Sequence, residues 1–185
     1  MADEITPEYR RRVAVALQQL GIDAQRLSAR RLPLFAETTR LAPVGLGTDG
    51  RDKALAPAAA KGWLAMRAQA RTDGVELLLV SGFRSLEFQA VLIRSKLQRG
   101  MKIDEIIRVN APPGYSEHHT GRAVDIGSAN CPPLEDAFDR TEAFAWLGKN
   151  ARRFGFSMSY PKANLHGFAY EPWHWCHRAT RPPRR

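Results

Sequence analysis

Residues 116–125 read Ser-Glu-His-His-Thr-Gly-Arg-Ala-Val-Asp, and the interpretation of the whole chain starts from this stretch. Catalytic zinc sites use imidazole nitrogen and carboxylate oxygen as ligands, with three protein ligands and one open position. His118 and Asp125 are seven residues apart, which is not the spacing of the helical ligand pair His-Glu-x-x-His, and that motif is absent here. This separation fits a loop that turns sharply at Gly121 and continues as a strand. The stretch therefore predicts two ligands of a zinc site, one before the turn and one on the strand.

A second cluster near the C-terminus, Glu171-Pro172-Trp173-His174, supplies what the first one lacks. His174 would complete a set of two histidines and one aspartate. Glu171 would then remain a free carboxylate beside a metal-bound water, which is the position of a general base. On an extended strand these two side chains face opposite sides, so a local twist or bulge at Pro172 is required to bring both into one pocket.

The remaining polar candidates have simpler interpretations. A single histidine or acid is more often structural or exposed than catalytic, and spacing alone leaves that alternative open for the metal set as well. We interpret His166 and His177 as structural or surface residues. His119 is expected behind the ligands or at the surface, and Glu117 is expected to be solvated. Two cysteines, Cys131 and Cys176, are too few for a disulfide framework and are expected to be reduced thiols.

Composition limits the class of protein. The chain has 185 residues with 44% hydrophobic and 25% charged residues, which suits one soluble domain spanning 1–185. The net charge of +9 first suggests a nucleic-acid partner. The basic residues are scattered and form no stripe with aromatic residues, so we expect no nucleic-acid partner.

Residues 178–185 are expected to be a flexible basic tail. No apolar run could span a membrane. No secretory signal is recognised at the N-terminus, which predicts a cytoplasmic protein, or a periplasmic or extracellular one if a leader was removed.

The pattern of caps, breakers and apolar positions predicts an α+β protein, because helices come first and short strands cluster late. Residues 1–55 are expected to be a helical extension packed on the domain, with residues 27–50 broken into turns. The third helix should bury Phe88, Val91, Leu92 and Leu97. Asp139 and Glu142 form a capping-box pattern before the last helix. The expected helices span 7–20, 57–71, 86–99, 103–108 and 140–154, and the expected strands span 75–80, 123–126, 156–160 and 170–175.

The motif Ser-x-His-x-x-Gly-x-Ala-x-Asp followed by Glu-x-Trp-His resembles the zinc D-alanyl-D-alanine carboxypeptidases of the VanY type, a family that includes L,D-carboxypeptidases and phage endolysins. The segments 81–85 with Gln89, 113–118, 146–151 and 154–161 agree with it in the same order, and the resemblance covers roughly residues 77–175. It implies a small central antiparallel sheet with flanking helices, as in the Hedgehog domain. Two departures are Trp175-Cys176-His177-Arg178, where the family usually continues differently, and the N-terminal third, which has no match.

The resemblance also implies roles for individual residues. It implies one zinc ion per chain on His118, Asp125 and His174, with Glu171 as the catalytic base. It implies that Arg84 stabilises the oxyanion, and that Ser116 and Gln89 hold the last residue of the substrate or its terminal carboxylate.

The expected function is removal of a C-terminal D-alanine from peptidoglycan stem peptides or muropeptides, by a D,D- or an L,D-carboxypeptidase. The alternatives are an endolysin-type L-alanyl-D-glutamate endopeptidase and a non-catalytic zinc module that binds the cell wall. Glu171 and Arg84 beside three ligands favour an enzyme, because binding alone would not require them. A cytoplasmic enzyme would meet recycled muropeptides, which predicts faster processing of tetrapeptide than of pentapeptide stems. The oligomeric state is left open.

Overall fold

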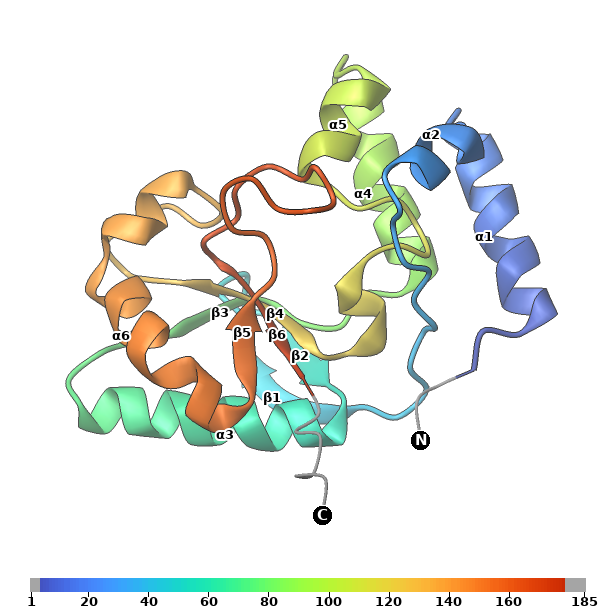
Figure 1. The fold of residues 1–185 in the computed structure, drawn as a ribbon. Helices are drawn as coiled ribbons and strands as arrows, with labels where there is room; N and C mark the ends of the chain where they lie inside the picture. The colour runs from blue at the N-terminus through green and yellow to red at the C-terminus, as the bar shows by residue number, and fades with distance from the viewer. Residues whose placement is uncertain (1–3, 179–185) are drawn as a thin grey trace.

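A four-stranded antiparallel sheet lies at the centre of the protein (Figure 1). The computed structural model describes residues 4–178, so the expected basic tail lies outside the described residues except for Arg178. The strands follow the order β3-β4-β6-β5. Every residue of β4 is buried, which makes it the central strand of the core. The bounds are β3 Leu78–Ser81, β4 Ala123–Gly127, β5 Phe156–Met158 and β6 His174–His177.

The register of this sheet aligns residues that are far apart in the sequence. Asp125 on β4 is the cross-strand partner of His174 on β6 and of Ser81 on β3. Side chains that are directly opposite each other on antiparallel strands lie close together on one face. The register therefore brings the two motifs of the sequence into contact at the middle of the sheet.

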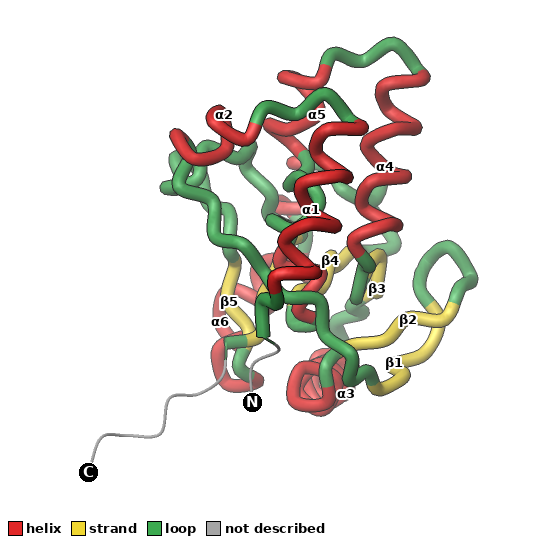
Figure 2. Tube along the Cα trace, turned by 90° about the vertical axis from the view of Figure 1, so that its right-hand side faces the viewer, coloured by secondary structure: helices red, strands yellow, loops and turns green. Residues whose placement is uncertain are grey.

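One core lies between the sheet and the helices α3 and α6 (Figure 1). Trp63 and Met66 on α3 are completely buried against Val124 and Ile126 of β4 and Phe156 of β5. A hairpin of two strands that the sequence did not predict lies beside α3 (Figure 2). The bounds are α3 Pro57–Thr72, α6 Glu142–Asn150, β1 Ala42–Leu46 and β2 Asp52–Leu55.

A second core holds four helices together on the other side of the sheet (Figure 2). Val13 and Leu17 of α1 pack with Leu86 and Ile93 of α4 and with Ile106 of α5. The expected caps of two of these helices are observed, since Thr6 accepts from the amide of Tyr9 and Ser85 from that of Phe88. The bounds are α1 Pro7–Gln19, α2 Ala24–Ala29, α4 Leu86–Gln98 and α5 Ile103–Val109.

Three local predictions were wrong. Phe88 and Val91 are about half exposed, and the buried face of α4 consists of Leu86, Gln89, Ala90 and Ile93 instead. The cap of α6 is Thr141, whose hydroxyl accepts from the amide of Phe144, and not Asp139. The last strand begins at His174 and not at residue 170, because residues 172–173 form a turn. Short 3₁₀ helices complete the fold at η1 Glu117–Thr120, η2 Asp136–Arg140 and η3 Ala151–Phe154.

Gly121 connects η1 to β4 and should be intolerant of a side chain. Its φ angle is +63°, and an added Cβ atom would lie 2.7 Å from the backbone nitrogen of Ala56 and 3.0 Å from Thr38 Cγ2. We expect Gly121→Ala to lower the free energy of unfolding by roughly 2–4 kcal/mol, from left-handed backbone strain and overpacking together. Urea denaturation measures this. Gly148→Ala on α6 is the matched control, because its Cβ atom would meet open space. Equal stability of the two variants would contradict this account of the turn.

Candidate metal centre

Three side chains converge at the middle of the sheet. His118 on η1, Asp125 on β4 and His174 at the start of β6 are all buried, and one ligand atom of each lies within 4.8 Å of the others. Asp125 Oδ1 lies 3.3 Å from His118 Nε2 and 3.1 Å from His174 Nδ1. Ligand atoms about 2.0–2.1 Å from a tetrahedral zinc ion are about 3.3 Å from one another, so these residues fit the ion.

Neighbouring groups orient two of these side chains toward the centre. His118 Nδ1 donates to the carbonyl oxygen of Gly82 at 2.6 Å, which leaves the lone pair of Nε2 facing Asp125. Asp125 Oδ2 accepts from Arg84 Nη2 at 2.6 Å, which leaves Oδ1 for a metal ion. Burial acts to raise the pKa of Asp125, but His118 and Arg84 hold it well below its usual range. The aspartate is therefore ionised, as a ligand must be.

Glu117 orients the third ligand, and the prediction that it is solvated was wrong. Its Oε2 atom accepts from His174 Nε2 at 3.0 Å and also from the hydroxyl of Ser159. Burial acts to raise the pKa of Glu117, but these two hydrogen bonds lower it to about 2. A carboxylate on the outer nitrogen of a ligating histidine fixes its ring and makes it a stronger ligand. Glu117 therefore directs His174 Nδ1 toward Asp125.

The two carboxylates on either side of His174 also affect its proton. Burial would lower the pKa of His174, yet its hydrogen bonds to Asp125 and Glu117 raise it to about 10. The pKa of His118 is shifted in the opposite direction, because burial lowers it to about 4. A metal ion that binds at His174 Nδ1 must therefore displace a proton, so metal binding should be coupled to proton release.

Glu171 lies beside the ligand set without belonging to it. The backbone turns at residues 171–174, where the amide of His174 donates to the carbonyl oxygen of Glu171 at 3.1 Å. This turn brings Glu171 Oε2 to 3.8 Å from His174 Nδ1, so a turn, and not a bulge in a strand, places both side chains in one pocket. Burial, opposed by His174 and reinforced by Asp125, raises the pKa of Glu171 to about 7. Such a carboxyl group suits acid–base catalysis near neutral pH.

Arg84 follows the end of β3, and its guanidinium group makes hydrogen bonds to three side chains. Its Nε donates to Ser81 Oγ at 3.0 Å, Nη1 donates to Gln89 Oε1 at 3.4 Å, and Nη2 binds Asp125. A guanidinium group has five N–H donors, so two are left after these bonds. Arg84 is thus a rigid donor beside the metal ligands.

Gln89 and Ser116, the expected substrate contacts, both line the same cleft. Gln89 is almost completely buried, and its Nε2 donates to the carbonyl oxygen of Ala111 at 2.7 Å. Ser116 Oγ accepts from the backbone amide of His118 at 3.3 Å. Both side chains therefore also support the surrounding backbone, and a substrate contact remains a prediction for each.

His119 supports the site from behind. It is completely buried; its Nδ1 donates to the carbonyl oxygen of Arg84 at 2.7 Å and its Nε2 accepts from the amide of Gly114 at 3.0 Å. These bonds require the neutral ring, and burial lowers the pKa of His119 to about 4. Its place next to His118 suggested a supporting position, but nothing in the sequence identified Arg84 as its partner.

A cleft of about 360 Å³ opens above the metal ligands. Its walls come from α4, from the loop after α5, from the start of η2 and from residues 168–173. A volume of this size suits a short peptide end or a small molecule. Among the described residues, the group of His118, Asp125 and His174 is the one that could hold a metal ion, and it lies at the base of this cleft.

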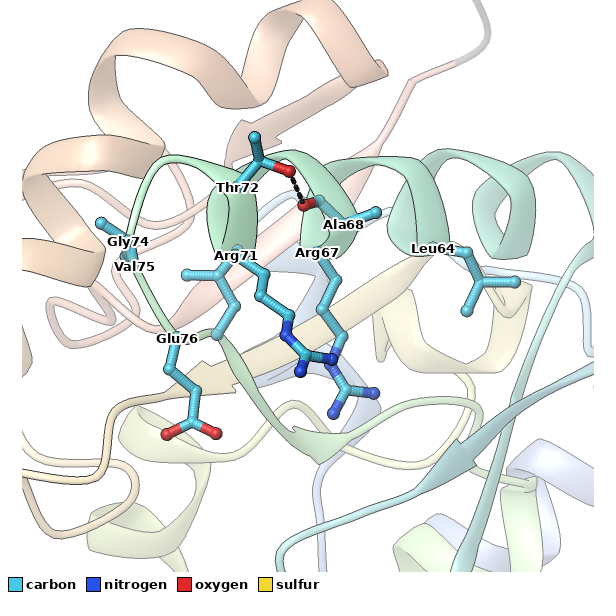
Figure 3. A pocket seen from close by; sticks show the side chains of 9 residues that line it. Leu64, Arg67, Ala68, Arg71, Thr72, Gly74, Val75 and Glu76 are labelled. Atoms are coloured by element: carbon cyan, nitrogen blue, oxygen red, sulfur yellow. Dashed lines mark hydrogen bonds between the residues drawn. The ribbon is translucent and has the colours of Figure 1, made fainter.

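A larger open groove of about 980 Å³ follows α3 and has a different character (Figure 3). The side chains of Arg67 and Arg71 extend side by side from the helix along it, and Thr72 bonds only to its own helix backbone. None of the three candidate metal ligands lines this groove. We therefore assign the chemistry to the smaller cleft.

Residues 52–180 match the family model described as VanY, D-alanyl-D-alanine carboxypeptidase. The chain belongs to the VanY family. The VanY region contains all the site residues described above. It begins at β2, so α1, α2 and β1 lie outside the matched region.

Individual relatives agree with this. YodJ of Bacillus subtilis is 40% identical over 110 residues, which cover 57% of this chain but only 39% of YodJ. The solved structure of the LdcB LD-carboxypeptidase is similar with a TM-score of 0.68 and 32% identity, over 76% of this chain and 69% of that one. A variant of the D,D-pentapeptidase VanY in complex with Zn(II) has a TM-score of 0.58 and 27% identity, over 76% and 79%. The expected α+β fold with a small antiparallel sheet is confirmed.

Two further expectations can be compared with the structure. Cys131 and Cys176 are free thiols, as expected. Within residues 4–178, every helix is too short or too polar to cross a membrane.

The role of Glu117 predicts an effect on metal affinity. Glu117→Gln removes the negative charge from the outer nitrogen of His174, so we expect zinc to bind roughly tenfold or more weakly. Competition with a chelator of known affinity measures this. Glu8→Gln, on the exposed face of α1, is the control. Unchanged zinc affinity in Glu117→Gln would mean that Asp125 and packing against Tyr160 orient the ring without help from Glu117.

The burial of neutral His119 predicts a pH dependence of stability. The unfolded chain protonates this histidine near pH 6.5, while the folded protein resists protonation until about pH 4. Neutral His119 therefore contributes up to about 3 kcal/mol to the free energy of unfolding. This contribution is complete above pH 6.5 and is lost as the pH falls toward 4. We expect His119→Gln to lose less stability than the parent over this interval in urea titrations. Above pH 7 the difference between the two proteins should be constant. If stability falls equally with pH in the parent and in His119→Gln down to pH 4, His119 does not take up a proton on unfolding.

Proposed function

We propose that this protein is a zinc-dependent carboxypeptidase that removes the C-terminal D-alanine from peptidoglycan stem peptides. The observation that carries the proposal is Glu171, a buried carboxyl group held beside three metal-ligand side chains and outside their set. Membership of the VanY family supports the substrate class, although the chain spans only about two fifths of the length of YodJ. The zinc ion would be held by His118, Asp125 and His174.

Glu171 and Arg84 have different roles in the proposed reaction. When bound, zinc supplies Lewis acidity and lowers the pKa of water. Glu171 accepts a proton from the water that attacks the scissile carbonyl carbon, and passes it to the nitrogen of the leaving D-alanine as the carbon–nitrogen bond breaks. Arg84 directs its free N–H groups at the carbonyl oxygen, where negative charge develops. The products are the shortened peptide and free D-alanine.

The geometry favours an enzyme over a non-catalytic wall-binding module. A binding module needs the ligand set, but it gains nothing from a carboxyl group with a pKa of about 7 beside that set. The preference for tetrapeptide over pentapeptide stems remains a prediction, which the peptide assay below decides.

Substitution of Glu171 tests the function. Glu171→Gln keeps the size of the side chain and the metal ligands, so we expect about one zinc ion per chain but turnover lower by roughly 10²-fold or more. The assay uses purified tetrapeptide and pentapeptide muropeptides, with the released products identified by mass spectrometry. Glu76→Gln, an exposed glutamate, is the control.

Two outcomes would contradict the proposal. Turnover near the parent level in Glu171→Gln would require another base. Release of a fragment cut between L-alanine and D-glutamate, in place of free D-alanine, would identify an endopeptidase.

A further inference from the structure

Lys96 points into the cleft from the third turn of α4. Leu86, Gln89 and Ile93 precede it at helical spacing and are all buried, so Lys96 continues the inward face of the helix. It lines the same cleft as His118 and Asp125, next to Asn110 and Ala111. The half-buried ammonium group is thus part of the substrate wall and not of the outer surface.

In the described part of the chain, no carboxylate lies within ion-pair distance of Lys96. Its Nζ donates to Asn110 Oδ1, which is a neutral acceptor, and none of the ion pairs of the described residues includes Lys96. Arg12, Lys53 and Arg84 each have a carboxylate at 2.5–2.8 Å. An ammonium group has three N–H donors, and the bond to Asn110 occupies one of them.

The electrostatic surroundings of this group also favour an anion. Burial lowers the pKa of Lys96, Arg99 and Arg84 lower it further, and Glu171 opposes them. Arg84 cannot neutralise an incoming anion alone, because its own charge is already engaged by Asp125. A partly desolvated cation among other cations is costly unless a negative group pairs with it.

We infer that Lys96 binds a carboxylate of the substrate and so selects peptides that present one at this wall. The inference rests on the proposed function, because a stem peptide offers two such groups. One is the C-terminal carboxylate of the D-alanine. The other is a side-chain carboxylate on the residue before the scissile bond, when that residue is a diamino dicarboxylic acid. The alternative is that Lys96 only holds Asn110 in place. In that case its substitution would not discriminate among peptides that differ in their carboxylates.

The test measures peptide binding in a Glu171→Gln background, so that no peptide is consumed. Calorimetry with zinc-loaded protein compares three tetrapeptides: the parent stem with a diamino dicarboxylic acid, the same stem with lysine in its place, and the parent stem ending in a carboxamide. Lys96→Met should weaken binding of the parent stem by about tenfold to a hundredfold, the range for a lost charged hydrogen bond. Lys96→Arg should keep most of the affinity. Lys149→Met, which removes an exposed lysine of α6, is the matched control and should bind as the parent does.

The peptides identify which carboxylate is bound. If the effect of Lys96→Met disappears with the carboxamide, the contact is to the C-terminus. If it disappears with the lysine stem, the contact is to the side chain. An equal loss on all three peptides, or no loss on any, overturns the inference, since a support for Asn110 does not discriminate among substrates.

Turnover of the parent protein on the same stems separates the two proposals. Cleavage by the parent together with undiminished binding in Lys96→Met rejects the role of Lys96 alone. Discriminating binding without any cleavage rejects the carboxypeptidase and keeps the carboxylate contact. Failure of every peptide to bind rejects both.

Discussion

The carboxylate of Asp125 is the group on which the structure of the site depends. It lies on a fully buried strand, where an unpaired negative charge would be strongly destabilising. Arg84 from the loop after β3, His174 from β6 and His118 from η1 all contact it. The same contacts that compensate the buried charge arrange the metal ligands, so the register of the sheet and the geometry of the site are fixed together.

Each group around Asp125 is in turn oriented by a further partner. The carbonyl oxygen of Gly82 fixes His118, the carboxylate of Glu117 fixes His174, and His119 bonds to the backbone of Arg84. A ligand set held this way needs little rearrangement to accept an ion. Donors alternate with acceptors in this network, so nearly every buried polar group of the site is hydrogen-bonded. An unpaired polar group buried here would lower the stability of the fold.

Sequence reasoning recovered what depends on local patterns and family motifs. The caps Thr6 and Ser85 and the candidate ligands were identified in this way. It failed where the outcome depends on tertiary contacts. Glu117 looks like a solvated acid in a turn, and only the approach of Ser159 and His174 from later strands makes it an internal carboxylate. The hairpin β1–β2 was missed because Pro43 and the glycines of this segment were interpreted as breaks, while its strand pairing and its packing on α3 stabilise it. On α4, apolar Phe88 is exposed and polar Gln89 is buried, because Gln89 finds partners in Arg84 and Ala111.

The division of the protein into two separate cores has a consequence for how the cleft can change by mutation. The metal ligands on the sheet belong to the part built on the first core, whereas Gln89 and Lys96 stand on α4, which packs in the second. The two sets of buried residues do not overlap. Mutations that repack the four-helix layer can therefore reshape this wall of the cleft while the half that carries the candidate metal ligands keeps its packing. Substitutions in the second core should therefore alter the peptide-facing wall with little effect on the packing around the candidate metal ligands.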